Sequence, residues 1–208
     1  MNQESANPIA LLRRLAQRPA PQERCGLCAT PLSPVHRHLV QPETRRIECA
    51  CDACALLFEN QSGRYRLVPR DPRALNGFAL DDLQWQRLGV PIGLAFFFHS
   101  SAAGKMMAFY PSPAGATEAQ LDLDAWNEIA GLSVSLQQLQ PDIEALLVNR
   151  VSPPHLYLIA PIDRCYELVG VVRKRWQGFS GGTELQAELA AFFDSLTPRL
   201  INTERASA

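Results

Sequence analysis

The sequence predicts an α+β protein in which a small N-terminal metal-binding module packs on an antiparallel sheet domain with flanking helices. Three observations support this prediction. Two Cys-x-x-Cys pairs lie between residues 25 and 54. Strand-like apolar runs cluster in the middle of the chain, and amphipathic helical patterns follow them. We expect four parts in chain order: an N-terminal helix over 1–20, a four-cysteine module over 21–70, an α+β domain over 71–200 and a disordered tail over 201–208.

The composition is that of an ordinary globular protein with almost no net charge. The 208 residues include 20 Lys and Arg and 21 Asp and Glu, so the formal charge is −1. This balance excludes a strong global attraction to nucleic acid or to anionic membranes. The longest apolar run, Val90–Phe98, is far shorter than the ~20 residues of a membrane helix, and residues 7–18 lack the pattern of a secretory signal. We therefore expect a cytoplasmic protein, in which clustered cysteines are more often metal ligands than disulfides.

Two short elements are expected to flank the module. Asn7 is a suitable N-cap, and Pro8 follows it at the first helical position, where proline is favoured. This predicts a helix that Pro19 ends. After the module, the apolar segment Leu56–Phe58 should pin it to the rest of the protein, and the alternation of Arg64–Val68 predicts a strand.

The cysteine pairs themselves predict a metal site. Two Cys-x-x-Cys turns that face each other put four thiolates in a tetrahedron, which suits a structural zinc and also a single iron. The spacer is slightly longer than the roughly 15–20 residues typical of a zinc signature, and a hairpin with strands His36–Val40 and Arg45–Cys49 can absorb the difference. We expect a zinc-ribbon-like or rubredoxin-like module, with zinc as the ion and iron as the alternative. The expected ligands are Cys25, Cys28, Cys51 and Cys54.

Three more donor residues in this region have roles that the sequence leaves open. Cys49 can replace Cys51 as a ligand, lie beside the site as a supporting thiol, or simply be a small buried residue at a strand end. His36 and His38 alternate on a strand, so both project to one face. They can reach the metal, but four cysteines already complete its coordination. Hydrogen bonding around the first cysteine turn, with partial exposure, is the alternative.

The domain after residue 71 is predicted to begin with a helix and a β-hairpin. Asp81 and Gln84 form a capping-box pattern at the start of a short helix. The nearly continuous apolar run Val90–His99 predicts a central strand, and Met106–Tyr110 predicts its antiparallel partner. Pro111–Gly115 has the composition of a loop.

The next elements are short helices and two further strands. Asp122 or Asp124 is expected to cap a helix, and Ser135 with Gln138 to cap a shorter turn. The two strands are expected at Ile143–Val151 and Leu156–Ala160.

Two amphipathic helices are predicted to close the chain. Asp163 is the expected cap of the first, and the glycine-rich residues 178–182 separate it from the second. Thr183 and Gln186 form a capping-box pattern at the start of the second helix, which Pro198 is expected to end.

No motif in the second half of the chain predicts a reaction. Gly178–Gly182 matches the G-x-S-x-G pattern, but a helix precedes it and no histidine follows it, so the nucleophile interpretation is rejected. Cys165 lies on a predicted helix without a base beside it and is expected to be a small buried residue. Phosphate-binding glycine loops and HExxH motifs are absent from the sequence.

The chain resembles an uncharacterised bacterial family whose genes lie beside those of oxygen-tolerant, high-affinity nickel–iron hydrogenases. The resemblance covers roughly residues 20–195 and includes the seven cysteine and histidine donors between residues 25 and 54. Its other segments are VPIGLAFFF, AFYPSPAGATE, EALLVNR, PIDRCYELVG and WQGFSGG. The resemblance implies a role in the assembly or operation of a hydrogenase, and it implies no catalytic residues.

These observations favour a non-enzymatic metal-binding accessory protein that docks onto a hydrogenase subunit or maturation factor. A site closed by four cysteines lacks the open position that catalysis requires. A rubredoxin-like one-iron electron carrier is the alternative that uses the same sulfurs. A zinc ribbon that binds nucleic acid through Arg37, Arg45 and Arg46 is a third hypothesis, which the near-neutral charge disfavours. An enzyme with a site between the sheet and the loop near Pro111 is a fourth, without a residue constellation behind it.

Overall fold

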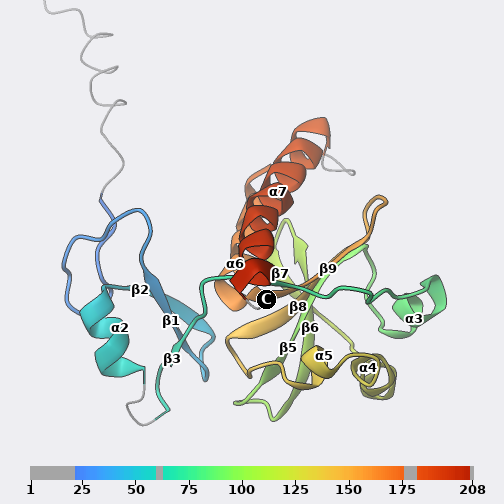
Figure 1. Cartoon of the computed structure of the whole chain (residues 1–208), viewed down its shortest axis with the longest axis horizontal. Coiled ribbons are helices and arrows are strands. Elements are labelled where there is room, and N and C mark those ends of the chain that lie inside the picture. The colour runs from blue at the N-terminus through green and yellow to red at the C-terminus, as the bar shows by residue number, and fades with distance from the viewer. Residues whose placement is uncertain (1–21, 60–62, 176–181, 207–208) are drawn as a thin grey trace, which may run out of the picture.

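The computed structural model describes residues 22–59, 63–175 and 182–206, and it contains two antiparallel sheets. A three-stranded sheet has the order β2-β1-β3, and a six-stranded sheet has the order β4-β9-β8-β5-β6-β7. The small sheet belongs to the cysteine module, which lies beside the large sheet in Figure 1. The α+β prediction is confirmed. The N-terminal helix predicted over 1–20 lies outside the described residues.

The module is built from a hairpin, a short helix and one added strand. The hairpin pairs β1 (Arg37–Gln41) with β2 (Arg46–Ala50) antiparallel, close to the predicted strands. Helix α2 (Asp52–Phe58) follows directly, and β3 (Arg66–Leu67) adds to the free side of β1. Alternate residues of β1 point in opposite directions. Leu39 enters the small core of the module, whereas Val40 enters the core of the large domain.

The large sheet places β5 and β8 at its centre, as the apolar sequence of β5 predicted. All of its strands pair antiparallel. Its strands are β4 (Arg73–Ala74), β5 (Leu94–Ser100), β6 (Lys105–Ser112), β7 (Gly115–Ala119), β8 (Glu144–Asn149) and β9 (Leu156–Pro161). Phe96 and Phe98 face one side of the sheet and Phe97 the other, so both faces need a covering layer.

Helices cover the two faces separately, as Figure 1 shows. Helices α6 (Ile162–Arg175) and α7 (Gly182–Ala206) cover the face of Phe96 and Phe98. Helices α3 (Asp82–Arg87), α4 (Leu123–Ala130) and α5 (Val134–Gln137) cover the face of Phe97. The module packs beside α6, so the cysteine region and the large domain share one buried boundary.

Two of the predicted helix starts are confirmed in atomic detail. The Asp81 carboxylate accepts from the Gln84 N–H at 2.7 Å, and the Gln84 side chain accepts from the Asp81 N–H at 2.9 Å, which completes a capping box. Asp122, rather than Asp124, caps α4 by accepting from the N–H groups of Asp124 and Ala125.

Other boundary predictions are corrected by the structure. Helix α5 begins after Ser133 instead of at Ser135. Pro111 lies inside β6 rather than in a loop, because pairing of β6 with β5 ends at Phe109 and the missing N–H of the proline breaks no ladder there. Asp163 lies within the first turn of α6 instead of capping it.

The end of the chain also differs from the prediction. Helix α7 continues past Pro198 to Ala206, so residues 201–206 are helical and do not form the disordered tail that was expected. A proline within a helix removes one donor and does not forbid the helix from continuing. The G-x-S-x-G residues 178–181 and the side chain of Thr183 lie outside the described part of the chain.

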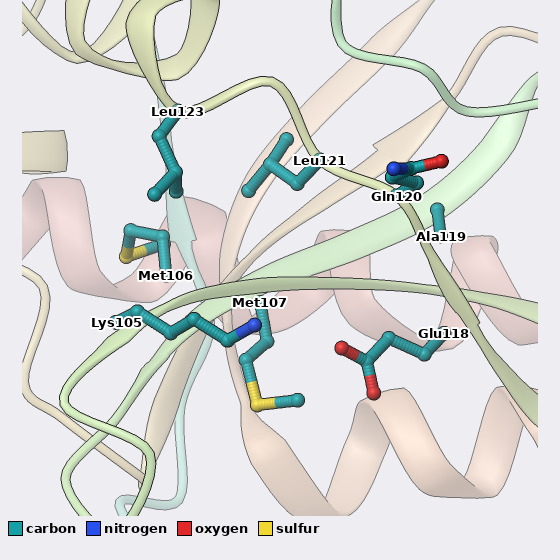
Figure 2. Close-up of a pocket in the computed structure, with 8 residues that line it drawn as sticks. All are labelled: Lys105, Met106, Met107, Glu118, Ala119, Gln120, Leu121 and Leu123. Carbon is teal, nitrogen blue, oxygen red and sulfur yellow. The ribbon is translucent and has the colours of Figure 1, made fainter.

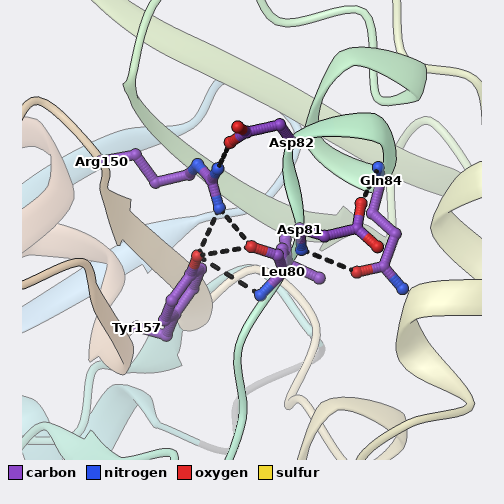
Figure 3. Close-up of polar contacts among 6 residues, drawn as sticks. All are labelled: Leu80, Asp81, Asp82, Gln84, Arg150 and Tyr157. Atoms are coloured by element: carbon purple, nitrogen blue, oxygen red, sulfur yellow. Dashed lines mark hydrogen bonds and ion pairs between the residues drawn. The ribbon is translucent and has the colours of Figure 1, made fainter.

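A buried arginine fixes the segment before α3 to the sheet. The Arg150 guanidinium donates to the Tyr157 hydroxyl at 2.7 Å and to the Leu80 carbonyl, and it pairs with Asp82 (Figure 3). The Arg150 side chain is only 5% exposed. These contacts pair the polar groups of the buried arginine and hold the segment before α3 in place. The buried charge therefore has a structural role.

Polar and aromatic contacts join the module to the large domain. Arg66 of β3 approaches the buried Asp142 at 3.5 Å, and the Arg45 guanidinium lies 5.2 Å from the centre of the Phe109 ring. The sequence predicted that the apolar segment Leu56–Phe58 pins the module to the rest of the protein, and this segment does not contribute to these contacts. Leu56 and Leu57 are largely exposed, because α2 turns them outward and buries Cys54 and Ala55 instead.

Candidate metal centre

The first cysteine pair lies on a tight turn stabilised by backbone hydrogen bonds. The Cys25 N–H donates to the Thr30 carbonyl at 2.9 Å, and the Ala29 N–H donates back to the Cys25 carbonyl at 2.8 Å. Ala29 has a φ of 60°, which closes the turn. The Gly26 N–H donates to the Cys49 carbonyl at 2.8 Å, so the turn is tied to the end of β2.

The second cysteine pair lies at the start of a helix instead of on a second turn of the same kind. Cys51 is the N-cap of α2, and its Sγ accepts from the Cys54 N–H at 3.4 Å. Cys54 sits in the first helical turn and is buried. The module is therefore a cysteine turn, a hairpin and a helix in chain order, and the predicted ribbon of two facing turns is not confirmed.

The four sulfurs converge at a spacing that suits one ion. The Sγ atoms of Cys25, Cys28, Cys51 and Cys54 all lie within 4.8 Å of one another. A tetrahedral site with Zn–S bonds of 2.3 Å places its sulfurs about 3.8 Å apart, and the Cys28 and Cys51 sulfurs are 3.8 Å apart. All six cysteines of the chain are described, and all are free thiols. This group can hold a metal ion, and its donors fit zinc and iron equally well.

Hydrogen bonds prepare part of this group to ionise. The hydroxyl and N–H of Thr30 lower the pKa of Cys28 to about 6, with help from Cys25 and Cys54. Burial acts to raise the pKa of Cys25, but N–H groups of Cys51, Leu27 and Cys28 outweigh it and lower that pKa. The pKa of Cys54 is raised by burial and by the neighbouring thiols. Metal binding requires thiolates, so an ion would replace the protons that remain.

The three undecided donors form a second group of their own. A ring nitrogen of His36, a ring nitrogen of His38 and the Cys49 Sγ lie within 4.8 Å of one another, and the four-cysteine group does not include them. Cys49 lies directly opposite His38 across the β1–β2 ladder. Burial, followed by the nearby carboxylates of Glu23 and Glu48, raises the pKa of Cys49. The sequence placed these residues in one region but did not separate them from the first site.

One residue near the second group was assigned another role by the sequence. The Asp163 carboxylate accepts a hydrogen bond from His38 Nδ1 at 2.7 Å. The two residues are 125 positions apart, and Asp163 was expected to cap α6. A carboxylate behind a histidine is typical of metal sites, but only the packing of α6 against the hairpin reveals the pair.

A cavity elsewhere in the large domain lacks the groups that catalysis needs. It has a volume of about 350 Å³ and lies between β6, β7 and the start of α4 (Figure 2). Among the described residues that line it, Lys105 and Glu118 are the charged ones, and the rest are mainly apolar. It therefore offers no nucleophile with an adjacent base.

The arginines proposed for nucleic-acid binding already have partners within the protein. Arg37 pairs with Asp52 at 3.5 Å, Arg46 pairs with Glu48 at 2.7 Å, and Arg45 lies over Phe109. This arrangement weighs against a free basic surface on the hairpin. Among the described residues, no helix has both the length and the apolar character of a membrane span.

Comparisons with known proteins identify a family but no relative of known activity. No curated protein and no solved structure matches the chain significantly. The model of a family of unknown function, DUF5947, matches residues 24–200, which include both donor groups and almost all of the described fold. The chain therefore belongs to the family of unknown function DUF5947.

Proposed function

We propose that the four-cysteine group holds a structural zinc, and that the protein is a non-enzymatic accessory factor that acts by docking onto another protein. The observation that carries this proposal is the convergence of four free thiols within 4.8 Å at one end of the module. Four thiolates complete the coordination of zinc and leave no position for a substrate. The ion then shapes the module rather than taking part in a reaction.

The small size of the module supports a structural role for the ion. Its apolar core contains seven buried residues, of which two, Cys25 and Cys54, are themselves expected ligands. Cores of this size rarely stabilise a fold without a metal or disulfides. Metal-binding free energy is folding free energy in such modules, so zinc supplies what the core lacks.

An exposed apolar pair beside the site supports the docking role. Leu56 and Leu57 are 73% and 60% exposed, and both lie on α2, which also carries Cys54. Exposed apolar patches on a rigid element are typical of protein interaction sites. The hydrogenase gene neighbourhood of the family that the sequence resembles suggests the partner: a subunit or a maturation factor of a nickel–iron hydrogenase in the cytoplasm.

Metal analysis of matched cysteine variants tests the structural part. Cys51→Ser should lose one zinc per chain and expose the hairpin amides to rapid hydrogen exchange. Cys165→Ser changes a buried cysteine outside the module and should keep the zinc content of the wild type. A metal-free Cys51→Ser protein with a fully protected hairpin would overturn the structural role.

A pull-down with purified hydrogenase subunits and maturation factors tests the docking part. Leu57→Glu should abolish capture of the partner while leaving zinc content unchanged. Leu83→Glu alters an equally exposed leucine on α3, in the large domain, and serves as the control. Equal capture by the wild type and Leu57→Glu would remove α2 from the proposed interface.

A one-iron electron carrier is the second candidate, and hydrogen bonds to the sulfurs favour it. The Cys51 sulfur accepts from the Cys54 N–H, and Cys25 accepts from several N–H groups. Such bonds tune the reduction potential of iron–thiolate centres. Protein purified from iron-replete cells would then be coloured and give a ferric EPR signal. A colourless protein with one zinc at the four cysteines would exclude this candidate.

A further inference from the structure

We propose that His36, His38 and Cys49 form a second zinc site, separate from the four cysteines and open to a cavity. One ring nitrogen of each histidine and the Cys49 Sγ lie within 4.8 Å of one another, the same limit that the four cysteine sulfurs meet. Two imidazoles and one thiolate are ligands that zinc accepts readily. This proposal rests on these residues alone and not on the function proposed above.

The hydrogen bonds of the two histidines leave the same nitrogen available on each ring. His36 Nδ1 lies 2.9 Å from the Ser33 carbonyl, and His38 Nδ1 lies 2.7 Å from the Asp163 carboxylate. A carbonyl and a carboxylate only accept, so Nδ1 carries the proton in both rings. In the neutral rings Nε2 therefore has a free lone pair, which is the form that binds metal.

The Nε2 atom of His36 is buried without a partner. The His36 side chain is 7% exposed, and its Nε2 makes no hydrogen bond within the described part of the chain. Burying an unpaired polar atom is unfavourable. An ion bound by His36, His38 and Cys49 would give this lone pair a partner. A purely structural role for His36 leaves the missing partner unexplained.

The surroundings of the cluster match the support that metal sites require. Metal-binding histidines usually donate their other N–H to a carboxylate or a backbone carbonyl. His38 donates to Asp163 of α6, and His36 donates to Ser33 of the loop before β1. These two contacts fix the rings at 4.8 Å between centroids and 80° between planes, so the site is built from both the module and the large domain.

The coordination that this site offers differs from that of the four cysteines. Three protein ligands leave one position of a tetrahedral zinc for water or another ligand. His36 and His38 line a cavity of about 510 Å³, and Arg37 and Arg164 line it as well. Asp71 and Asp163 line the same cavity, so its walls carry charges of both signs. The fourth ligand is therefore a water or a small anion that enters from this cavity.

Zinc titration of the full chain tests the site with zinc alone as the probe. Samples are loaded with Zn²⁺, desalted and analysed for zinc per chain. Cys49→Ala and His36→Gln should each bind one zinc fewer than the wild type. His155→Gln makes the same change at an exposed histidine outside the cluster and should match the wild type. Equal zinc content in the wild type and in Cys49→Ala would overturn the proposal.

Cobalt substitution shows whether a variant has lost metal from the second site or from the four-cysteine site. In the Co²⁺-loaded protein, Cys49→Ala should lose the charge-transfer absorption of one thiolate while keeping the stronger absorption of the four-cysteine site. A wild type with one zinc that Cys49→Ala abolishes would support this site and refute the four-cysteine one. Co²⁺ spectra that are identical in the wild type and in Cys49→Ala would refute the second site alone.

Discussion

The cysteine module and the large domain keep their shape by different means. Apolar clusters of 21 and 17 buried residues lie on the two faces of the large sheet, and the first of these clusters takes in Val40 and Val68 from the module. The module's own cluster has seven buried residues, and the module also contains two groups of side chains that could hold a metal ion. If ions bind as proposed, the fold of the module depends on them, whereas the fold of the large domain depends on packing. Both groups of side chains that could hold a metal ion among the described residues lie in the module.

Removal of metal should give the largest contrast between the two regions. Treatment with a strong chelator, or Cys28→Ser, should unfold the module, because structural zinc contributes roughly 10–16 kcal/mol in small zinc domains. Hydrogen exchange should then become fast in β1 and β2 and stay slow in β5 and β8. Exchange that rises equally in both sheets would show that the two regions unfold as one unit.

A mutation that creates a cavity in the core on the far face of the large sheet should destabilise the large domain and leave the module intact. Phe97 is fully buried between Trp85 and Trp126 on the face away from the module. Phe97→Ala should lower the free energy of unfolding of the large domain by about 3–5 kcal/mol. Urea unfolding and zinc analysis of the same sample check this. Zinc content should equal that of the wild type, and a loss of zinc would contradict the independence of the two regions.

The contact between Arg66 and Asp142 joins the module to the large domain, and its removal should have a smaller effect than the two changes above. Asp142 is 4% exposed and keeps a hydrogen bond from the Ser101 N–H when the arginine is removed. Arg66→Ala should therefore cost about 1–3 kcal/mol, the usual range for a buried group that loses one partner. Unfolding curves recorded with a probe in the module and with a probe in the large domain should lie further apart in this variant than in the wild type. Arg64→Ala, an exposed change nearby, is the control.

The helix cap at Asp81 should have the smallest effect. Asp81→Ala removes one side-chain acceptor from α3 and should cost about 1 kcal/mol. Asp81→Asn keeps an acceptor and should lose less. Thermal unfolding measures both, and zinc content should be unchanged in each. A drop in zinc content would show that the stability of α3 is coupled to metal binding in the module.

The sequence predicted those parts of the fold that are set by local patterns. The hairpin of β1 and β2, the central strand β5 and the capping box at Asp81 follow from alternation, apolar runs and cap chemistry. The four cysteine sulfurs converge as predicted, because the Cys-x-x-Cys spacing brings two sulfurs together both on a tight turn and at the start of a helix. Helix α7 passes through Pro198, where a helix end was predicted, so this proline alone does not decide where the helix ends.

The rest depends on contacts between distant segments, which spacing does not encode. The exposure of Leu56 and Leu57 follows from the way that α2 turns to bury Cys54. The separation of His36, His38 and Cys49 from the four cysteines requires the β1–β2 register and the approach of α6. Asp163 contacts this second group, through His38, only when the hairpin and α6 are packed together.

Zinc analysis and X-ray absorption of the Cys49→Ala protein, purified without added metal or chelator, test whether the four cysteines hold a zinc ion. This variant isolates the four-cysteine site from the second cluster. The account predicts one zinc per chain, surrounded by four sulfurs at about 2.3 Å. A folded, metal-free protein whose residues 25, 28, 51 and 54 are joined in disulfides would contradict it.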